Sequence, residues 1–170
     1  AWWVAGPFDA PAGEGLTTLY PPDEELDLSD RYDGKGDAKV AWQKAERPLT
    51  PGADFGAEYF VNLATVFGER HYDAVAYALV YLHASEDLEA VLALGSDDGV
   101  VVRLNGREIH RVAVGRAYQA RQDRVPLRLV AGVNTLLLRV DQHGGDWGFG
   151  ASVERADGRP EPRVRALLTP

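Results

Sequence analysis

Residues 88–112 read LEAVLALGSDDGVVVRLNGREIHRV and contain the clearest local fold signals of the sequence. An apolar run is followed by Gly-Ser-Asp-Asp-Gly, and a second run, Val100–Leu104, leads through Asn105-Gly106 into Arg107–Val112. Asn-Gly between two alternating segments is the strongest short-range signal of a β-hairpin, because a type I′ turn needs a positive φ at both central residues. The sequence therefore predicts a strand, a loop and a tight hairpin in succession.

The two-residue turn also predicts the register of the hairpin. Such a register places one pair of opposite charges on one face and an apolar pair on the other, which is a consistent arrangement for two paired strands. The predicted pairs are Leu104 with Arg107, Arg103 with Glu108, and Val102 with Ile109.

Short apolar runs recur on both sides of the hairpin. Within residues 72–82, Val75, Tyr77 and Leu79 alternate with residues that are also small or apolar, so both faces of this strand are expected to be covered. Helix is the competing interpretation, but the β-branched and aromatic residues favour a strand. Further predicted strands are Trp2–Val4, Val40–Trp42, Leu88–Leu94, Val125–Leu129, Leu136–Val140 and Trp147–Val153. Many short strands without a convincing helix predict an all-β fold, an antiparallel β-sandwich of the jelly-roll type.

Composition narrows the kind of protein. The 170 residues fit one domain over 1–170, with ordinary globular composition, and no apolar run approaches the roughly 20 residues that span a bilayer. There is no Cys, so neither a disulfide framework nor a thiolate metal site is possible. The chain has no Met and no signal-peptide pattern, so we interpret it as an excised or processed piece of a longer protein.

The charge distribution argues against two classes of partner. Residues 1–85 carry 14 acidic and 6 basic side chains, whereas residues 86–170 carry 12 of each, and every base in that second half is Arg. Proteins that bind nucleic acid are expected to present a basic face. The acidic balance therefore predicts no nucleic-acid partner and no binding to anionic membranes.

Motifs of catalysis are missing from the sequence. It contains no Gly-x-Ser-x-Gly nucleophile elbow, no His-Glu-x-x-His metal motif and no Gly-rich phosphate loop. The four His residues are scattered, and no pair of carboxylates stands out as a glycosidase pair. We therefore expect no enzyme activity; a hydrolase or lyase that uses scattered carboxylates is the catalytic alternative.

The adjacent residues Asp97 and Asp98 are the candidate metal ligands. Two carboxylates on a loop between strands could coordinate a hard cation such as calcium, which prefers several oxygen ligands. Calcium needs more ligands than two, and the candidates are Asn105, Asp123, Asp141, Asp146 and backbone carbonyls. Two alternatives stay open: the Asp side chains bond the backbone of a tight turn, or an Arg such as Arg103 or Arg116 lies between the charges.

Aromatic side chains on loops offer a second way to contact a glycan, because sugar C–H faces stack on flat rings. Trp147 lies in a Gly-flanked segment, and Tyr118 lies in the loop 115–124. A Trp in a β-sandwich is also a common core residue, so core packing is the competing interpretation for each indole. The predicted carbohydrate-binding residues are Trp147, Tyr118, Asp146, Asn105 and Asp123.

Three segments carry a family resemblance: residues 94–99, residues 102–107, and the run from Leu129 through Gly132-Val133-Asn134 to Val140. They resemble the galactose-binding-like jelly-roll modules that accompany bacterial glycoside hydrolases and polysaccharide lyases. The Ser-Asp-Asp-Gly step also resembles the protective-antigen-type adhesin module of yeast flocculins. In that adhesin family an adjacent Asp pair holds a calcium ion that in turn grips a sugar diol, so the resemblance implies calcium at Asp97 and Asp98.

The resulting expectation is a non-catalytic carbohydrate-binding or ancillary module of an extracellular or periplasmic carbohydrate-active protein. Its expected partners are a polysaccharide or oligosaccharide and the catalytic domain of a parent protein. The alternative is a structural jelly roll that packs on a catalytic domain and binds no ligand itself.

Overall fold

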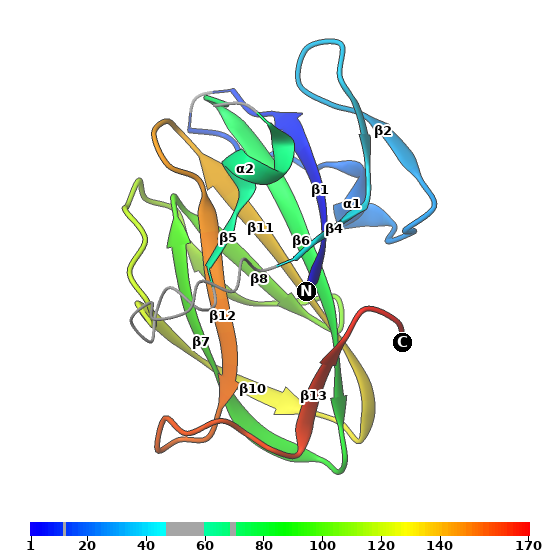
Figure 1. The fold of residues 1–170 in the computed structure, drawn as a ribbon, viewed down its shortest axis with the longest axis vertical. Helices are drawn as coiled ribbons and strands as arrows, with labels where there is room; N and C mark the ends of the chain where they lie inside the picture. The colour runs from blue at the N-terminus through cyan, green and yellow to red at the C-terminus, as the bar shows by residue number, and fades with distance from the viewer. Residues whose placement is uncertain (12, 47–59, 69–70) are drawn as a thin grey trace.

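The computed structural model describes residues 1–11, 13–46, 60–68 and 71–170, and these form two antiparallel β-sheets packed as a sandwich (Figure 1). The larger sheet contains β1 (Trp2–Asp9), β4 (Gln43–Ala45), β6 (Ala74–Ala84), β8 (Val100–Leu104), β9 (Arg107–Val112), β11 (Gly132–Gln142) and β13 (Val164–Leu167). The smaller sheet contains β5 (Phe60–Asn62), β7 (Leu88–Asp97), β10 (Asp123–Leu129) and β12 (Gly148–Glu154). The predicted antiparallel β-sandwich is confirmed.

The strand order brings segments that are distant in sequence side by side. It is β4-β1-β6-β11-β8-β9 in the larger sheet, with β13 also paired to β6, and β10-β7-β12-β5 in the smaller sheet. Two further strands, β2 (Arg31–Asp33) and β3 (Lys39–Ala41), pair with each other. The described helices are short, α1 (Pro21–Glu24) and α2 (Leu63–Phe67), and none of the described helices is long and apolar enough to cross a membrane.

Side-chain alternation along the strands builds the core between the sheets. Along β11, Leu136, Leu138 and Val140 point into the main buried cluster. Leu137 and Arg139 lie on the opposite face of the same strand and are buried too, at 8% and 3% exposed. The outer face of the larger sheet is therefore covered by other residues.

The N-terminal segment provides this cover. Ala10, Tyr20, Tyr32, Val40 and Trp42 form a second buried cluster with the outward-facing residues of β6. The rings of Phe8 and Tyr20 pack on Tyr77 of β6, with centroids 5.6 and 6.3 Å apart. The expectation that both faces of this strand are covered is confirmed. Within this segment, residues Pro21–Glu24 form the one-turn helix α1, which has Pro at its start.

The hairpin at Asn105-Gly106 forms as predicted, with φ of 51° and 79° at its two turn residues. The pairs Leu104–Arg107 and Arg103–Glu108 are confirmed. The third predicted pair is wrong: Val102 lies opposite His110, because the register shifts by one residue between Val102 and Arg103.

The turn makes a direct prediction for Gly106. We expect Gly106→Val to lower the free energy of unfolding by about 1–3 kcal/mol, because a β-branched residue is strained at positive φ. No other group lies near a Cβ atom at this position, so strain is the expected cause. Chemical denaturation measures the loss, and Gly106→Asn is the matched control, since Asn tolerates this conformation. Equal stability of both variants would contradict the type I′ turn.

Candidate functional site

The Asp97–Asp98 step lies where the chain crosses from the smaller sheet to the larger one. Asp97 ends β7 opposite Gly148 of β12, and β8 begins three residues later at Val100. The Asp98 N–H donates to the Asp141 carbonyl of β11 at 3.0 Å, so the step is tied to both sheets. The peptide bond between the two Asp residues is cis. Both residues are nearly buried, at 9% and 7% exposed.

Backbone amides from two loops hold the carboxylates. In the loop between β9 and β10, Arg116 N donates to Asp98 Oδ1 at 3.0 Å and Tyr118 N donates to Asp97 Oδ2 at 3.3 Å. In the loop between β11 and β12, His143 N donates to Asp98 Oδ2 at 2.8 Å. The backbone therefore orients the pair, although the donors belong to other loops rather than to the pair's own turn.

No cationic side chain of the described ranges forms an ion pair with either carboxylate. The Arg103 guanidinium pairs with Asp23 at 2.7 Å. The Arg116 guanidinium pairs with Asp123 at 2.5 Å and donates to Ser96 Oγ at 2.8 Å. The alternative in which one of these Arg side chains neutralises the Asp pair is therefore wrong for the described structure.

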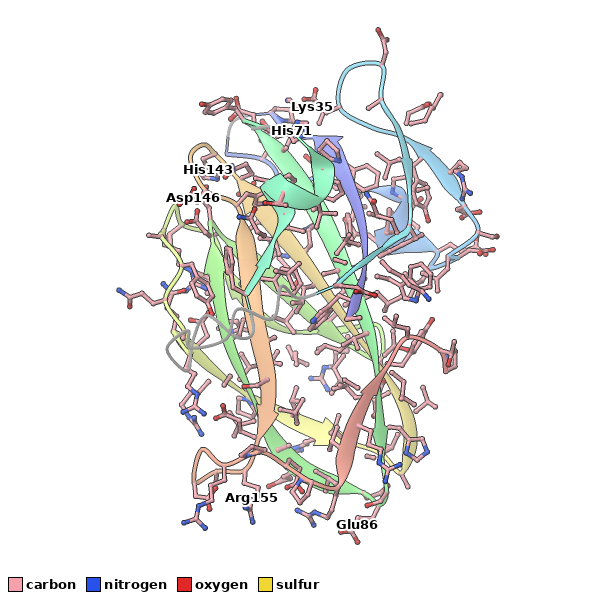
Figure 2. The ribbon with its side chains drawn as sticks, viewed as in Figure 1. Lys35, His71, Glu86, His143, Asp146 and Arg155 are labelled. Atoms are coloured by element: carbon pink, nitrogen blue, oxygen red, sulfur yellow. The ribbon has the colours of Figure 1, made fainter. Side chains whose placement is uncertain are left out.

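The surroundings of the Asp pair raise the pKa of the Asp97 carboxyl. Burial is the main cause that raises the pKa of the Asp97 carboxyl, and the charges of Asp98 and Asp146 raise it further, against the lowering effect of the Tyr118 hydrogen bond. Asp146 is exposed in the loop between β11 and β12, and Figure 2 shows it beside His143 at one end of the sandwich. The structure thus brings Asp97, Asp98 and Asp146 into one acidic neighbourhood.

Tyr118 lies against the outer face of the smaller sheet, next to Asp97. A Cβ atom at Gly95 would lie 2.8 Å from the Tyr118 ring, and one at Gly150 would lie 2.4 Å from its hydroxyl. These two glycines pair with each other across β7 and β12, so they form a floor for the ring. The ring also packs on Phe60, with centroids 4.6 Å apart, and is half-buried. Phe60 was not predicted from the sequence. The available signal for a ring packed at this place was the two glycines at 95 and 150, which leave room for it on the sheet surface.

Comparison with known proteins shows which solved domains share this fold. No family model and no curated protein match the sequence. Among solved structures, the PA14 sugar-binding domain from an RTX adhesin matches over 97% of this chain and 94% of that chain, with a TM-score of 0.53 and 13% identity. The chain has a PA14-type fold. The galactose-binding-like assignment stays a prediction.

Two other structures match less well. The β-glucosidase from Kluyveromyces marxianus matches with a TM-score of 0.49 and 16% identity over 91% of this chain. The PA14 domain of the antifreeze protein MpAFP matches with a TM-score of 0.43 and 14% identity over 55% of this chain. The matches span 16% of the glucosidase chain and 51% of the antifreeze-protein chain.

The side-chain oxygens around Asp97 and Asp98 are of the kind that calcium prefers as ligands. Calcium binds about six to eight oxygen atoms, and Asp97, Asp98 and Asp146 offer carboxylate oxygens near one another. Within the described residues, no three His, Asp or Glu side chains form a ready-made metal cluster. The remaining oxygens would have to come from backbone carbonyls, water or the hydroxyls of a ligand.

Trp147 is not a surface platform. It is 0% exposed and lies under α2, with its ring centroid 5.5 Å from Phe67 and 6.1 Å from His71. Its carbonyl accepts a hydrogen bond from Leu63 N at 2.9 Å. The neighbouring glycines suggested an exposed loop, but Trp147 directly precedes β12 and its side chain points into the core. The core interpretation of Trp147 is therefore correct.

Asn105 and Asp123 have other roles. Asn105 lies at the opposite end of β8 from Asp98, where its side chain donates to Asn134 Oδ1 and accepts from Thr135 N. These bonds fasten the hairpin to β11, so Asn105 is not part of the site. Asp123 lies closer, but both of its oxygens accept hydrogen bonds from Arg116, which holds the loop that carries Tyr118.

Asp141 is also engaged. Its Oδ2 lies 2.7 Å from His143 Nε2, and its Oδ1 accepts from Gln142 N at 3.0 Å. The hydrogen bond to Asp141 raises the pKa of the His143 imidazole. Asp141 therefore contributes its backbone to the step and its side chain to the neighbouring loop.

Proposed function

We propose that this chain is a non-catalytic carbohydrate-binding module that binds a polysaccharide or oligosaccharide through a calcium ion held at Asp97 and Asp98. The observation that carries the proposal is the pair itself: two nearly buried carboxylates, fixed by amides from two loops, without an ion-pair partner in the described part of the chain. Buried charges are normally paired or coordinate metals. A bound cation supplies the missing positive charge.

Three carboxylates of the chain would contribute to calcium binding. Asp97 and Asp98 are oriented before any ligand arrives, because Arg116, Tyr118 and His143 hold their oxygens by backbone donors. Asp146 adds an exposed carboxylate at the tip of the neighbouring loop. Bound calcium would supply coordination positions for two neighbouring sugar hydroxyls.

Tyr118 supplies the apolar side of the proposed site. Gly95, Gly150 and Phe60 lie against its ring, which is half-buried and close to Asp97. Tyr rings are common in recognition surfaces, because they combine an apolar ring with a polar hydroxyl. A sugar ring held near the Asp pair would therefore meet Tyr118 through its C–H face.

The likeness in fold to an adhesin's sugar-binding domain supports this proposal without assigning a glycan. We further propose that the module works outside the cytoplasm, in the extracellular or periplasmic space, and beside a catalytic domain of its parent protein. The net charge of −8 supports a partner other than nucleic acid or an anionic membrane.

A structural module without a ligand of its own is the second candidate. It is favoured by the absence, among the described residues, of a three-residue metal cluster. It is also favoured by the amide hydrogen bonds, which already satisfy three of the four carboxylate oxygens of the pair. This candidate predicts neither calcium binding nor glycan binding.

The proposal predicts calcium-dependent glycan binding that needs Asp98. On a glycan array, the immobilised sugars should retain the wild-type protein in millimolar calcium, and chelator should release the protein. Asp98→Asn should lose this retention, because it removes a charge and an oxygen ligand from the ion. The matched control is Asp37→Asn, the same change at an exposed residue outside the site. Retention that is unaffected by both chelator and Asp98→Asn would contradict the proposal.

A further inference from the structure

Residues 14–25, here called the strap, reach from the outer face of the larger sheet to the back of the Asp97–Asp98 step. A Cβ atom at Gly99 would lie 2.9 Å from Leu16 Cδ1, and one at Gly15 would lie 2.4 Å from Asp141 Oδ1. Both glycines are buried, and Leu16 is 3% exposed. Gly15 and Leu16 therefore pack directly on Gly99 and Asp141.

Gly99 and Asp141 are the residues that hold the step from behind. Asp98 N donates to the Asp141 carbonyl at 3.0 Å, and Asp141 N donates to the Gly99 carbonyl at 2.9 Å. Two residues beyond Asp141, His143 N binds the Asp98 carboxylate. The strap therefore contacts Gly99 and Asp141, and these two residues are linked by backbone hydrogen bonds to Asp98.

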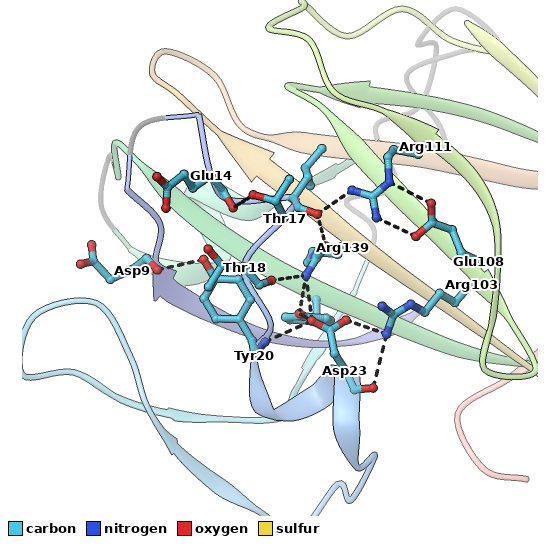
Figure 3. Close-up of polar contacts among 12 residues, drawn as sticks. Asp9, Glu14, Thr17, Thr18, Tyr20, Asp23, Arg103, Glu108, Arg111 and Arg139 are labelled. Atoms are coloured by element: carbon cyan, nitrogen blue, oxygen red, sulfur yellow. Dashed lines mark hydrogen bonds and ion pairs between the residues drawn. The ribbon is translucent and has the colours of Figure 1, made fainter.

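A buried cation fastens the strap to the sheet at this place (Figure 3). Arg139, on the outer face of β11, is 3% exposed, and its guanidinium donates to the Leu16 carbonyl, to the Thr18 carbonyl at 2.8 Å and to Asp23 Oδ2 at 2.7 Å. Arg111 of β9 donates to the same Leu16 carbonyl at 2.5 Å. Two guanidinium groups thus converge on the residue whose side chain touches Gly99.

From these contacts we infer that Leu16 is a positioning residue for the Asp97–Asp98 step, and that Arg139 acts through it. Leu16 touches neither carboxylate; it limits the movement of Gly99, and through the two backbone hydrogen bonds it limits the movement of Asp98. Groups that orient ligand residues from behind matter for binding because a site loosened by about 1 Å loses much of its affinity. This role deepens the proposed function and rests on it for its calcium readout.

Calcium affinity tests the inference. Calorimetry should show that Leu16→Ala weakens calcium binding by about 10- to 100-fold, the range typical of lost outer contacts at metal sites. Leu19→Ala is the matched control, because Leu19 belongs to the same strap and is 68% exposed. Leu127→Ala controls for lost stability, because Leu127 is a core leucine of β10 at 1% exposed. Both controls should bind calcium within about twofold of wild type, and the milder Leu16→Val replaces Leu16→Ala if the latter does not fold.

Amide hydrogen exchange in calcium-free protein separates this inference from the proposed function. Leu16→Ala should speed exchange of the Asp98 and Asp141 amides more than that of amides in β6, whereas Leu127→Ala should show no such preference. If the wild type binds no calcium, the proposed function fails and exchange alone decides the role of the strap. Unchanged relative exchange at Asp98 in Leu16→Ala overturns the inference, as does a loss of calcium affinity that Leu127→Ala reproduces.

Discussion

Trp147→Ala is expected to lower the free energy of unfolding by about 3–5 kcal/mol, the usual cost of removing a large aromatic side chain from a core. Trp147 is the largest fully buried side chain of the described residues, and the ring of Phe67 in α2 packs on it. Its removal leaves a cavity at the end of the sandwich where α2 covers the core. Chemical denaturation measures the loss.

Trp147→Phe is the matched variant. The indole Nε1 has no hydrogen-bond partner within the described structure, so a phenyl ring forfeits volume but no polar contact. We expect a loss well below that of Trp147→Ala. If Trp147→Ala kept wild-type stability and abolished glycan binding, the ring would be a platform and its burial in the core would be contradicted.

Asp23→Ala is expected to cost about 3–5 kcal/mol, because it removes the carboxylate from a buried ion pair and strands a charge. The Asp23 side chain is 3% exposed and lies 2.7 Å from Arg139, whose side chain is 4% exposed. It also accepts a hydrogen bond from the Tyr77 hydroxyl at 2.6 Å. Thermal and chemical unfolding should both report the loss.

Replacing both members of the buried Asp23–Arg139 pair distinguishes the stranded Arg139 charge from lost packing. The double variant Asp23→Leu with Arg139→Met should recover part of the stability, because buried ion pairs are often replaceable by apolar residues. Arg103, which also pairs with Asp23, keeps its charge in this variant, but its side chain is 19% exposed and can reach solvent. Asp27→Ala, in the same segment but exposed, should stay within about 0.5 kcal/mol of wild type. A double variant no more stable than Asp23→Ala would contradict this explanation.

Local sequence patterns were sufficient to predict the hairpin turn and the long strands, but not the short strands β2, β4, β5 and β13. Asn105-Gly106 sets its turn through backbone preferences that act within four residues, so no long-range contact was needed to predict it. The register shift at Val102 depends on how β9 meets the rest of the sheet, and the turn alone does not report it. The cover provided by the segment from Ala10 to Trp42 was also missed, because its aromatic residues are spaced irregularly and become one cluster only when folded on β6.

The candidate site was predictable in part for the same reason. Asp97, Asp98 and Asp146 stood out by residue type, and the fold brings them close. Trp147 was misjudged because flanking glycines suit an exposed loop and a tight strand entry equally well. The partners of Arg103 and Arg116 depend on contacts across 80 and 7 residues of sequence, which no local pattern encodes.

A calcium titration of the wild-type protein, followed by melting curves, shows whether Asp97 and Asp98 hold a calcium ion. A ligand that binds only the folded state raises its stability by mass action, so we expect a saturable rise in Tm that chelator reverses and that Asp98→Asn abolishes. A flat Tm up to millimolar calcium would contradict it and leave Asp97 and Asp98 as carboxylates held by backbone amides alone.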